Sequence, residues 1–284
     1  MFKTRTVFVI GAGASCELGL PAGDALRSHI AAAVAPAETE SDRFAKDRVN
    51  SAVMQLCQRE AGDTWGNVFR RYREAAAKLR SALPYAPSID TYLDAHRNDR
   101  DIITLGKLGI AESILTAEQL SALSEDGIDP ARRKSNQNTL ASSWYLPLAH
   151  MLNTGFRTDT VSELFENVSF IVFNYDRCLE QFLLTSLVQY FDVDAGRAAE
   201  LVSRVEIVHA YGKVGELPWQ DGDATPFGGE PRTDLMRVAE QIQTFTETVD
   251  TGVADRIKWL VQEAQTLVFM GFGVLEQHMD LLTP

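Results

Sequence analysis

The stretch VFVIGAGASCELGLPAG, residues 7–23, joins a short apolar run to a glycine-containing turn. The run TVFVI at 6–10 is rich in β-branched and aromatic residues and lacks polar alternation, which is typical of a strand buried on both faces. Leu26, Ile30 and Val34 follow at a spacing of four, which predicts a helix. The stretch therefore predicts a strand, a glycine turn and a helix.

Three later segments share the character of this first strand: VSFIVF (168–173), VEIVH (205–209) and TLVFMG (266–271). The second strand is also followed by a helical stripe of apolar residues, which consists of Leu179, Phe182, Leu183 and Leu187. A strand followed by a helix, repeated along the chain, predicts an α/β fold with a Rossmann-like, doubly wound parallel sheet.

Little strand character appears between the first strand–helix unit and the second. Residues 36–165 open with the polar, acidic segment PAETESDRFAKDR and carry helical patterns at 43–60, 65–82, 88–97, 106–123 and 137–152. We interpret residues 1–284 as a single domain, with a Rossmann-like core of 1–35 and 166–284 interrupted by a helical insertion or lid at 36–165. The Gly/Pro/Asp-rich segment 215–234 predicts a loop.

Composition excludes several classes of protein. The formal net charge of −12 argues against a sequence-independent grip on DNA or RNA, which needs basic surfaces. The cysteines Cys16, Cys57 and Cys178 form no C-x-x-C pair, so neither a zinc site nor a disulfide framework is indicated. No apolar run approaches the roughly 20 residues that span a bilayer. We therefore expect a cytoplasmic protein without a bound metal.

The glycine loop alone leaves two interpretations open. Gly11 and Gly13 stand between a strand and a helix, where backbone amides and a helix N-terminus can meet a pyrophosphate. The dinucleotide fingerprint would have a third glycine at position 16, where this chain has Cys16, and an acidic residue after a second strand about 20 residues on. No Gly-Lys-Ser/Thr follows, as a P-loop requires. Nucleotide binding and a plain packing turn fit the loop equally.

Polar or glycine residues follow each of the other predicted strands. Asn174 and Asp176 follow the second strand, His209 ends the third, and Gly271 and Gly273 follow the fourth. The carboxyl ends of parallel strands share one edge, where open α/β sheets bind ligands. Asp176 also fits the cap of the next helix, and a single histidine is more often a packed or surface residue. The agreement of all four strands favours a ligand site.

One helix of the predicted lid offers a further candidate. SIDTYLDAH at 88–96 places Ser88 at an N-cap and Asp90 in the first turn, where the helix dipole favours a carboxylate. This structural interpretation of Asp90 is favoured, although a lid helix could aim the carboxylate at the ligand site.

The motifs GAGAS with GLPAG, FNYD, HAYG and GFG, in this order, resemble those of bacterial sirtuin-like domains. SIDTYL and the helix start at Gly106–Lys107 are similar to further features of that family. The resemblance covers nearly the whole chain. It implies that the ligand is NAD, bound in an extended form across the edge of the sheet.

The resemblance also implies a role for each residue at that edge. Gly11, Ala12, Gly13 and Ser15 would cradle the pyrophosphate; Gly271, Phe272 and Gly273 would border the adenosine half; Asn174 and Asp176 would hold the nicotinamide ribose and the attacking water or acceptor; and His209 would be the general base. Deacetylase sirtuins carry a four-cysteine zinc module, which this sequence lacks. Water is then the expected acceptor, and the expected activity is NAD hydrolysis to nicotinamide and ADP-ribose.

For such domains the family resemblance implies NAD depletion in anti-phage defence, switched on by a homo-oligomeric assembly or by a separate sensor or effector protein. Three alternatives remain at this stage. The first is a non-catalytic sensor of NAD or ADP-ribose, although a sensor has no need of the base at His209. The second is an NAD-dependent deacylase or ADP-ribosyltransferase with a macromolecular acceptor. The third is a structural subunit that binds no NAD.

Overall fold

A computed structural model describes residues 2–35, 47–61, 64–124, 130–220, 222, 224–244 and 250–283. Most of the acidic segment predicted to begin at residue 36 lies outside the described residues, as do positions 43–46 of the helix expected at 43–60.

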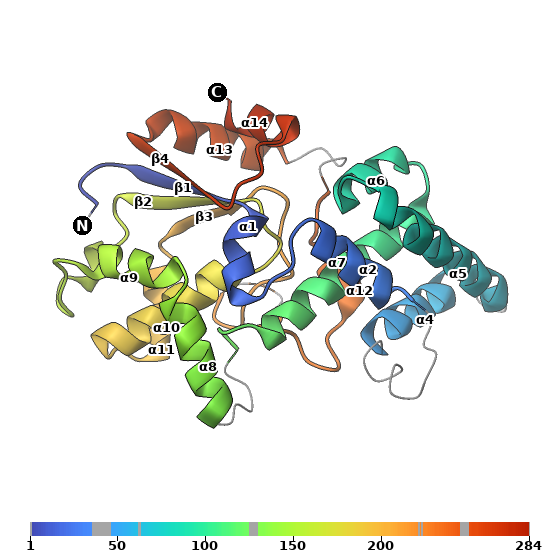
Figure 1. Cartoon of the computed structure of the whole chain (residues 1–284), viewed down its shortest axis with the longest axis horizontal. Coiled ribbons are helices and arrows are strands. Elements are labelled where there is room, and N and C mark those ends of the chain that lie inside the picture. Colours follow the sequence, from blue (N-terminus) through green and yellow to red (C-terminus); the bar gives the residue numbers. More distant parts are fainter. Residues whose placement is uncertain are drawn as a thin grey trace.

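The described strands form one parallel sheet in the order β3–β2–β1–β4 (Figure 1). Their bounds are β1 Thr6–Ile10, β2 Val168–Val172, β3 Glu206–His209 and β4 Thr266–Met270. The predicted α/β class with a Rossmann-like parallel sheet is thus confirmed, and each strand lies within one residue of its expected bounds. In register, Thr6 pairs with Val168 on one side and with Thr266 on the other, so β1 is central.

Helices make up most of the remaining described chain: α1 Ala12–Ser15, α2 Asp24–Ala33, α4 Asp47–Ala61, α5 Trp65–Ala82, α6 Ile89–Ala95, α7 Arg100–Leu120, α8 Pro130–Ala141, α9 Tyr145–Asn153, α10 Cys178–Phe191, α11 Ala195–Val202, α12 Leu235–Glu240, α13 Thr251–Glu263 and α14 Glu276–Leu282. Within the described ranges, no helix has both the length and the apolar character needed to cross a membrane.

Two helices differ from the sequence prediction for local reasons. Helix α7 begins six residues before the expected start because the carboxylate of Asp99 accepts the first free amides, those of Asp101 and Ile102. The single helix expected at 137–152 is two helices, α8 and α9. The hydroxyls of Ser142 and Ser143 donate to carbonyls three residues earlier, and such local bonds compete with a continuous helix.

Apolar layers cover both faces of β1 and β2, whereas β3 is half-buried and β4, which was expected to be a buried strand, is largely exposed. Val7, Val9 and Ile171 belong to one buried cluster, which includes side chains of α13 and α14. Phe8 and Phe170 belong to a second, which includes side chains of α9, α10 and α11. Figure 1 shows α13 and α14 above the sheet and α9, α10 and α11 below it. This double coverage explains why β1 and β2 lack polar alternation. It does not apply to β4, where the apolar side chains of Leu267 and Phe269 are exposed.

The helices expected to form the insertion are continuous with one of these layers. Buried side chains of α4, α5, α6 and α7 belong to the same cluster as Val9 and Ile171. Helix α7 packs closely on α2, where a Cβ at Gly109 would lie 2.7 Å from the Ile30 side chain. The division into a core and an insertion at 36–165 stays a prediction.

Candidate functional site

The glycine loop after β1 packs directly against the turn after β4. The amide of Gly11 donates to the carbonyl of Met270 and that of Gly13 to the carbonyl of Gly271, each at 3.0 Å. A Cβ at Gly11 would lie 2.6 Å from the Gly271 oxygen, and one at Gly13 would lie 2.8 Å from it. Because the two loops approach so closely, a side chain larger than that of glycine would not fit at position 11 or 13. In this arrangement two amides expected to cradle a phosphate donate to protein carbonyls.

Trp144 anchors the other side of the loop. Its indole N–H donates to the carbonyl of Ala14, and its backbone amide donates to the Glu17 carboxylate, each at 2.8 Å. Trp144 lies four residues from both Leu140 and Leu148, a spacing that indicates packing but neither of these hydrogen bonds. The α1 turn that carries Ser15 is thus held in place by β4 on one side and by the start of α9 on the other.

Ser15, Asn174 and Asp176, predicted from two different motifs, form one buried chain of hydrogen bonds. The amide nitrogen of Asn174 donates to Ser15 Oγ at 3.0 Å, and Ser15 Oγ donates to Asp176 Oδ1 at 3.1 Å. The three residues are 1%, 4% and 6% exposed in the order Ser15, Asn174, Asp176. The same Asp176 oxygen accepts the Cys178 amide at 3.1 Å. The N-cap position of α10 is Arg177, and Asp176, the residue before it, accepts the first amide of the helix and also joins the candidate site.

The environment of Asp176 favours its neutral form more than water does. Burial raises the pKa of this carboxyl, the Cys178 amide lowers it, and the charge of Glu118 raises it again. Tyr145, a residue that the sequence prediction missed, is buried against the same group. Desolvation, together with the nearby Cys178 and Asp176, raises the pKa of the Tyr145 hydroxyl well above its ordinary value.

The side-chain oxygen of Asn174 is buried and has no hydrogen-bond partner among the described residues. The orientation of the amide is fixed, because Ser15 Oγ donates to Asp176 and must accept from the nitrogen of Asn174. A buried acceptor without a partner costs about 1–3 kcal/mol. A ligand or an ordered water molecule can donate the missing hydrogen bond to such an acceptor.

His209 contacts the backbone of Asn174 and the side chain of Glu180. Nδ1 is 3.0 Å from the backbone oxygen of Asn174, and Nε2 is 2.9 Å from Glu180 Oε1. Lys213 Nζ lies 3.2 Å from the same Glu180 oxygen and 2.9 Å from Glu216. Both ring nitrogens thus already have protein partners. The role of His209 as a general base stays a prediction.

Glu180 is an ionised buried carboxylate. Its side chain is 1% exposed, and this burial by itself raises its pKa. The charge and hydrogen bond of His209, together with Lys213, outweigh that effect and set the pKa at about 2. The sequence did contain a signal for this residue. Glu180 lies three and seven positions before Leu183 and Leu187, so it occupies the apolar stripe of its helix.

The turn after β4 adds an aromatic cluster, defined as Phe173, Tyr211, Phe272 and His278. The ring of Phe173 lies 5.0 Å from that of Phe272 and 4.8 Å from that of His278, and Tyr211 lies 5.7 Å from His278. Phe272 therefore packs on the end of β2. Gly271, expected beside the adenosine, has a left-handed φ of +54°, whereas a Cβ at Gly273 would meet nothing within 4 Å.

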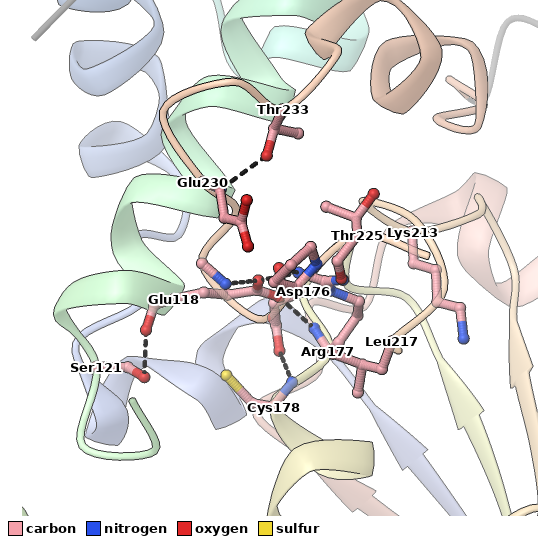
Figure 2. A network of polar contacts seen from close by, with 12 residues as sticks. Glu118, Ser121, Asp176, Arg177, Cys178, Lys213, Leu217, Thr225, Glu230 and Thr233 are labelled. Atoms are coloured by element: carbon pink, nitrogen blue, oxygen red, sulfur yellow. Dashed lines mark hydrogen bonds and ion pairs between the residues drawn. The ribbon is translucent and has the colours of Figure 1, made fainter. Parts of the chain in front are cut away.

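Arg177, which directly follows Asp176, forms a buried ion pair with Glu118 that the sequence did not predict (Figure 2). Arg177 and Glu118 have fully buried side chains, and Arg177 Nε lies 3.1 Å from Glu118 Oε1. The guanidinium also donates to the carbonyls of Thr225 and Pro226, while the amide of Gly228 donates to Glu118. The pair therefore joins α7, the start of α10 and the loop at 224–230.

Asp90 links α6 to the sheet edge. Ser88 caps α6 as expected, accepting the Thr91 amide at 3.0 Å. Asp90 Oδ1 accepts the hydroxyl of Tyr175, the neighbour of Asn174, at 2.9 Å. Burial raises the pKa of Asp90 to about 6, although the Tyr175 hydrogen bond opposes the shift. The carboxylate thus contacts the segment that carries Asn174.

Asp90→Asn is expected to change how stability depends on pH. The folded pKa of Asp90 lies above its ordinary value of 3.8, so the folded state binds the extra proton. The stability contributed by that proton is complete below about pH 4 and is lost as the pH rises through 6, a loss on the order of 3 kcal/mol. Urea unfolding at pH 4, 5, 6 and 7 should show this loss in the wild type and in Asp94→Asn on the same helix. Equal pH slopes for Asp90→Asn and the wild type would contradict the prediction.

A separate hollow of about 1030 Å³ lies between α4, α5, α7 and α12, and no predicted site residue lines it.

In the described part of the chain, no group of three or more His, Cys, Asp and Glu side chains is placed to hold a metal ion. At the sheet edge, Asn174 contributes a buried amide oxygen, Ser15 a hydroxyl and Asp176 a carboxyl group. Comparison with protein-family models, with curated proteins and with solved structures finds no match to this chain.

Proposed function

We propose that this chain binds NAD at the carboxyl edge of its sheet and hydrolyses it to nicotinamide and ADP-ribose. The observation that carries the proposal is the buried, unpartnered oxygen of Asn174, fixed in orientation beside Ser15 and Asp176. The site lies where open parallel sheets bind ligands. The resemblance of the FNYD motif to sirtuin-like domains supports NAD as that ligand.

The chemistry of NAD hydrolysis suits this set of groups. The bond between ribose C1′ and the pyridinium nitrogen breaks, its electron pair stays on the nitrogen, and nicotinamide leaves as a neutral molecule. Positive charge develops on the ribose, and an ionised Asp176 would stabilise it. The Asn174 oxygen would accept a hydrogen bond from a ribose hydroxyl or from the attacking water. The water oxygen bonds to C1′, and its proton passes to the solvent.

A sensor that binds NAD without turnover is the second candidate. Both ring nitrogens of His209 have protein partners, an arrangement that suits a binding module as well as an enzyme. In either case, the proposed cellular role is anti-phage defence through NAD, in an assembly or with a partner protein.

Nicotinamide and ADP-ribose release from NAD should be measured for the wild type and for Asn174→Ala, with NAD binding on the same samples. We expect kcat to fall about 10²–10³-fold in Asn174→Ala, the loss that follows removal of one preorganised transition-state hydrogen bond. Asn167→Ala is the matched control, because Asn167 precedes the opposite end of β2 and its amide donates to the Phe2 carbonyl.

The products separate the remaining possibilities. Free ADP-ribose supports hydrolysis, whereas acetyl-ADP-ribose or a modified protein means transfer to another acceptor. Binding without turnover by the wild type, at concentrations that allow assembly, would favour the sensor. Failure of the wild type to bind NAD would contradict both candidates.

A further inference from the structure

The backbone of residues 172–175 is held by a continuous set of contacts where β2 ends. The carbonyl of Val172 accepts the amide of Ala210 at 2.9 Å, and that of Tyr175 accepts the amide of Val214 at 3.0 Å. Between them, the carbonyl of Asn174 faces Nδ1 of His209 at 3.0 Å. The imidazole thus occupies the place of a backbone donor in the series.

Asn174 is consequently held at two points. Its backbone oxygen faces His209, and its amide nitrogen donates to Ser15. The side-chain oxygen has no partner among the described residues. A shift of the backbone at Asn174 would move this oxygen, so the contact with His209 helps to fix its position.

The hydrogen-bond partners of His209 determine its protonation. A carbonyl oxygen only accepts, so Nδ1 carries a proton. A carboxylate at Glu180 also only accepts, so Nε2 would be the donor in the contact of 2.9 Å between them. The side chain of His209 is 7% exposed, which leaves little access for water to replace either partner. Both ring nitrogens therefore face oxygen acceptors, an arrangement that a doubly protonated imidazole satisfies.

The surrounding charges would balance a doubly protonated His209. Glu180 lies between His209 and Lys213, and Lys213 also pairs with Glu216. The four charges alternate in sign and sum to zero. The cluster therefore adds no net positive charge beside a site where a cationic transition state is proposed to form.

We propose that His209 is a positioning residue, a doubly protonated imidazole that Glu180 holds in place and that fixes the backbone of Asn174. The kinetic tests of this proposal rest on the proposed function, NAD hydrolysis. The positioning role replaces the general-base role that the sequence predicted for His209. A base must take up a proton, and His209 has no free nitrogen to receive one. Its effect on the reaction passes through the position of the Asn174 amide.

Three variants separate the two roles. His209→Asn has no basic nitrogen, but its amide can donate to the Asn174 carbonyl from about the place of Nδ1. Its kcat should stay within about tenfold of the wild type, the cost of one weakened hydrogen bond. His209→Ala has no donor and should lose on the order of 10²-fold. His209→Gln, whose amide lies near the place of Nε2, should resemble His209→Ala. NAD binding and urea unfolding of each variant control for misfolding.

A general base would give a different pattern. All three variants would then lose on the order of 10²–10⁴-fold. Equal losses in His209→Asn and His209→Ala, with NAD binding retained, would overturn the positioning role.

A spectroscopic measurement tests the proposal without any activity. Nitrogen-15 NMR of the wild type at pH 7 should show His209 with both ring nitrogens protonated, the signal being assigned by its absence in His209→Asn. In Glu180→Gln the Nε2 proton should be lost while Nδ1 remains protonated. A neutral His209 ring in the wild type would overturn the proposal. Because this measurement needs no NAD, the proposal can fail or hold independently of NAD hydrolysis.

Discussion

Glu118→Gln is expected to lower the free energy of unfolding by about 3–5 kcal/mol. The substitution keeps the size of the side chain but leaves the fully buried guanidinium of Arg177 without its counter-charge. Attraction to Glu118 offsets the cost of removing that cation from water, and a glutamine amide cannot replace this attraction. Urea unfolding followed by circular dichroism measures the loss.

An exposed pair gives the control for this prediction. Arg197 and Glu200 are 39% and 64% exposed, so Glu200→Gln should change stability by less than about 1 kcal/mol. The double variant Glu118→Leu, Arg177→Met should be less destabilised than the sum of its single substitutions, because it leaves no unpaired charge. Full recovery is not expected, because the amide of Gly228 and the carbonyl of Pro226 also lose their partners. Similar losses in Glu118→Gln and Glu200→Gln would contradict the prediction.

Gly271→Ala is expected to destabilise the fold by about 2–5 kcal/mol and to abolish NAD binding. The new Cβ would lie 1.9 Å from the Ala14 nitrogen and 2.4 Å from the Gly13 carbonyl carbon, both backbone atoms that no change of rotamer can move. The φ of +54° adds about 1–2 kcal/mol of left-handed strain to an overpacking cost of about 1–3 kcal/mol. Relief of the overlap would displace the turn that carries Ser15.

Two other glycines separate the causes of this effect. Gly273→Ala adds a methyl group that meets nothing within 4 Å, so stability should stay within about 0.5 kcal/mol of the wild type. Gly19 has a φ of +93° with open space around it, so Gly19→Ala isolates the strain of about 1–2 kcal/mol. Urea unfolding and NAD titration of the three variants provide the comparison. The explanation fails if Gly271→Ala is no less stable than Gly19→Ala.

The sequence predicted the sheet well because each strand is a continuous apolar run whose end is marked by glycine or polar residues. Burial on both faces accounts for this pattern in β1 and β2, but not in β4, where Leu267 and Phe269 are exposed. The meeting of Ser15, Asn174 and Asp176 was also predictable, because the carboxyl ends of neighbouring parallel strands share one edge. That rule needs only the strand assignments and no knowledge of side-chain packing.

Contacts that depend on how distant elements pack were not predictable in the same way. The partner of Arg177 lies on α7, and the reason for glycine at Gly11 lies in the turn after β4. From the local sequence, the glycine loop fitted a phosphate site and a packing turn equally. The orientation of the His209 ring likewise depends on its contact with Glu180. The position of Glu180 on an apolar stripe predicts that its charge is buried, but it does not predict which residue pairs with it.

The position of β1 at the centre of the sheet has a consequence for synthesis. Thr6 pairs with Val168 and Thr266, so the ribosome must add about 160 residues before the first partner strand exists. At 5–20 residues per second this interval lasts about 8–30 s. Helices α4, α5 and α7 pack on one another and can dock during that time. The apolar first strand lacks both of its sheet partners throughout this interval.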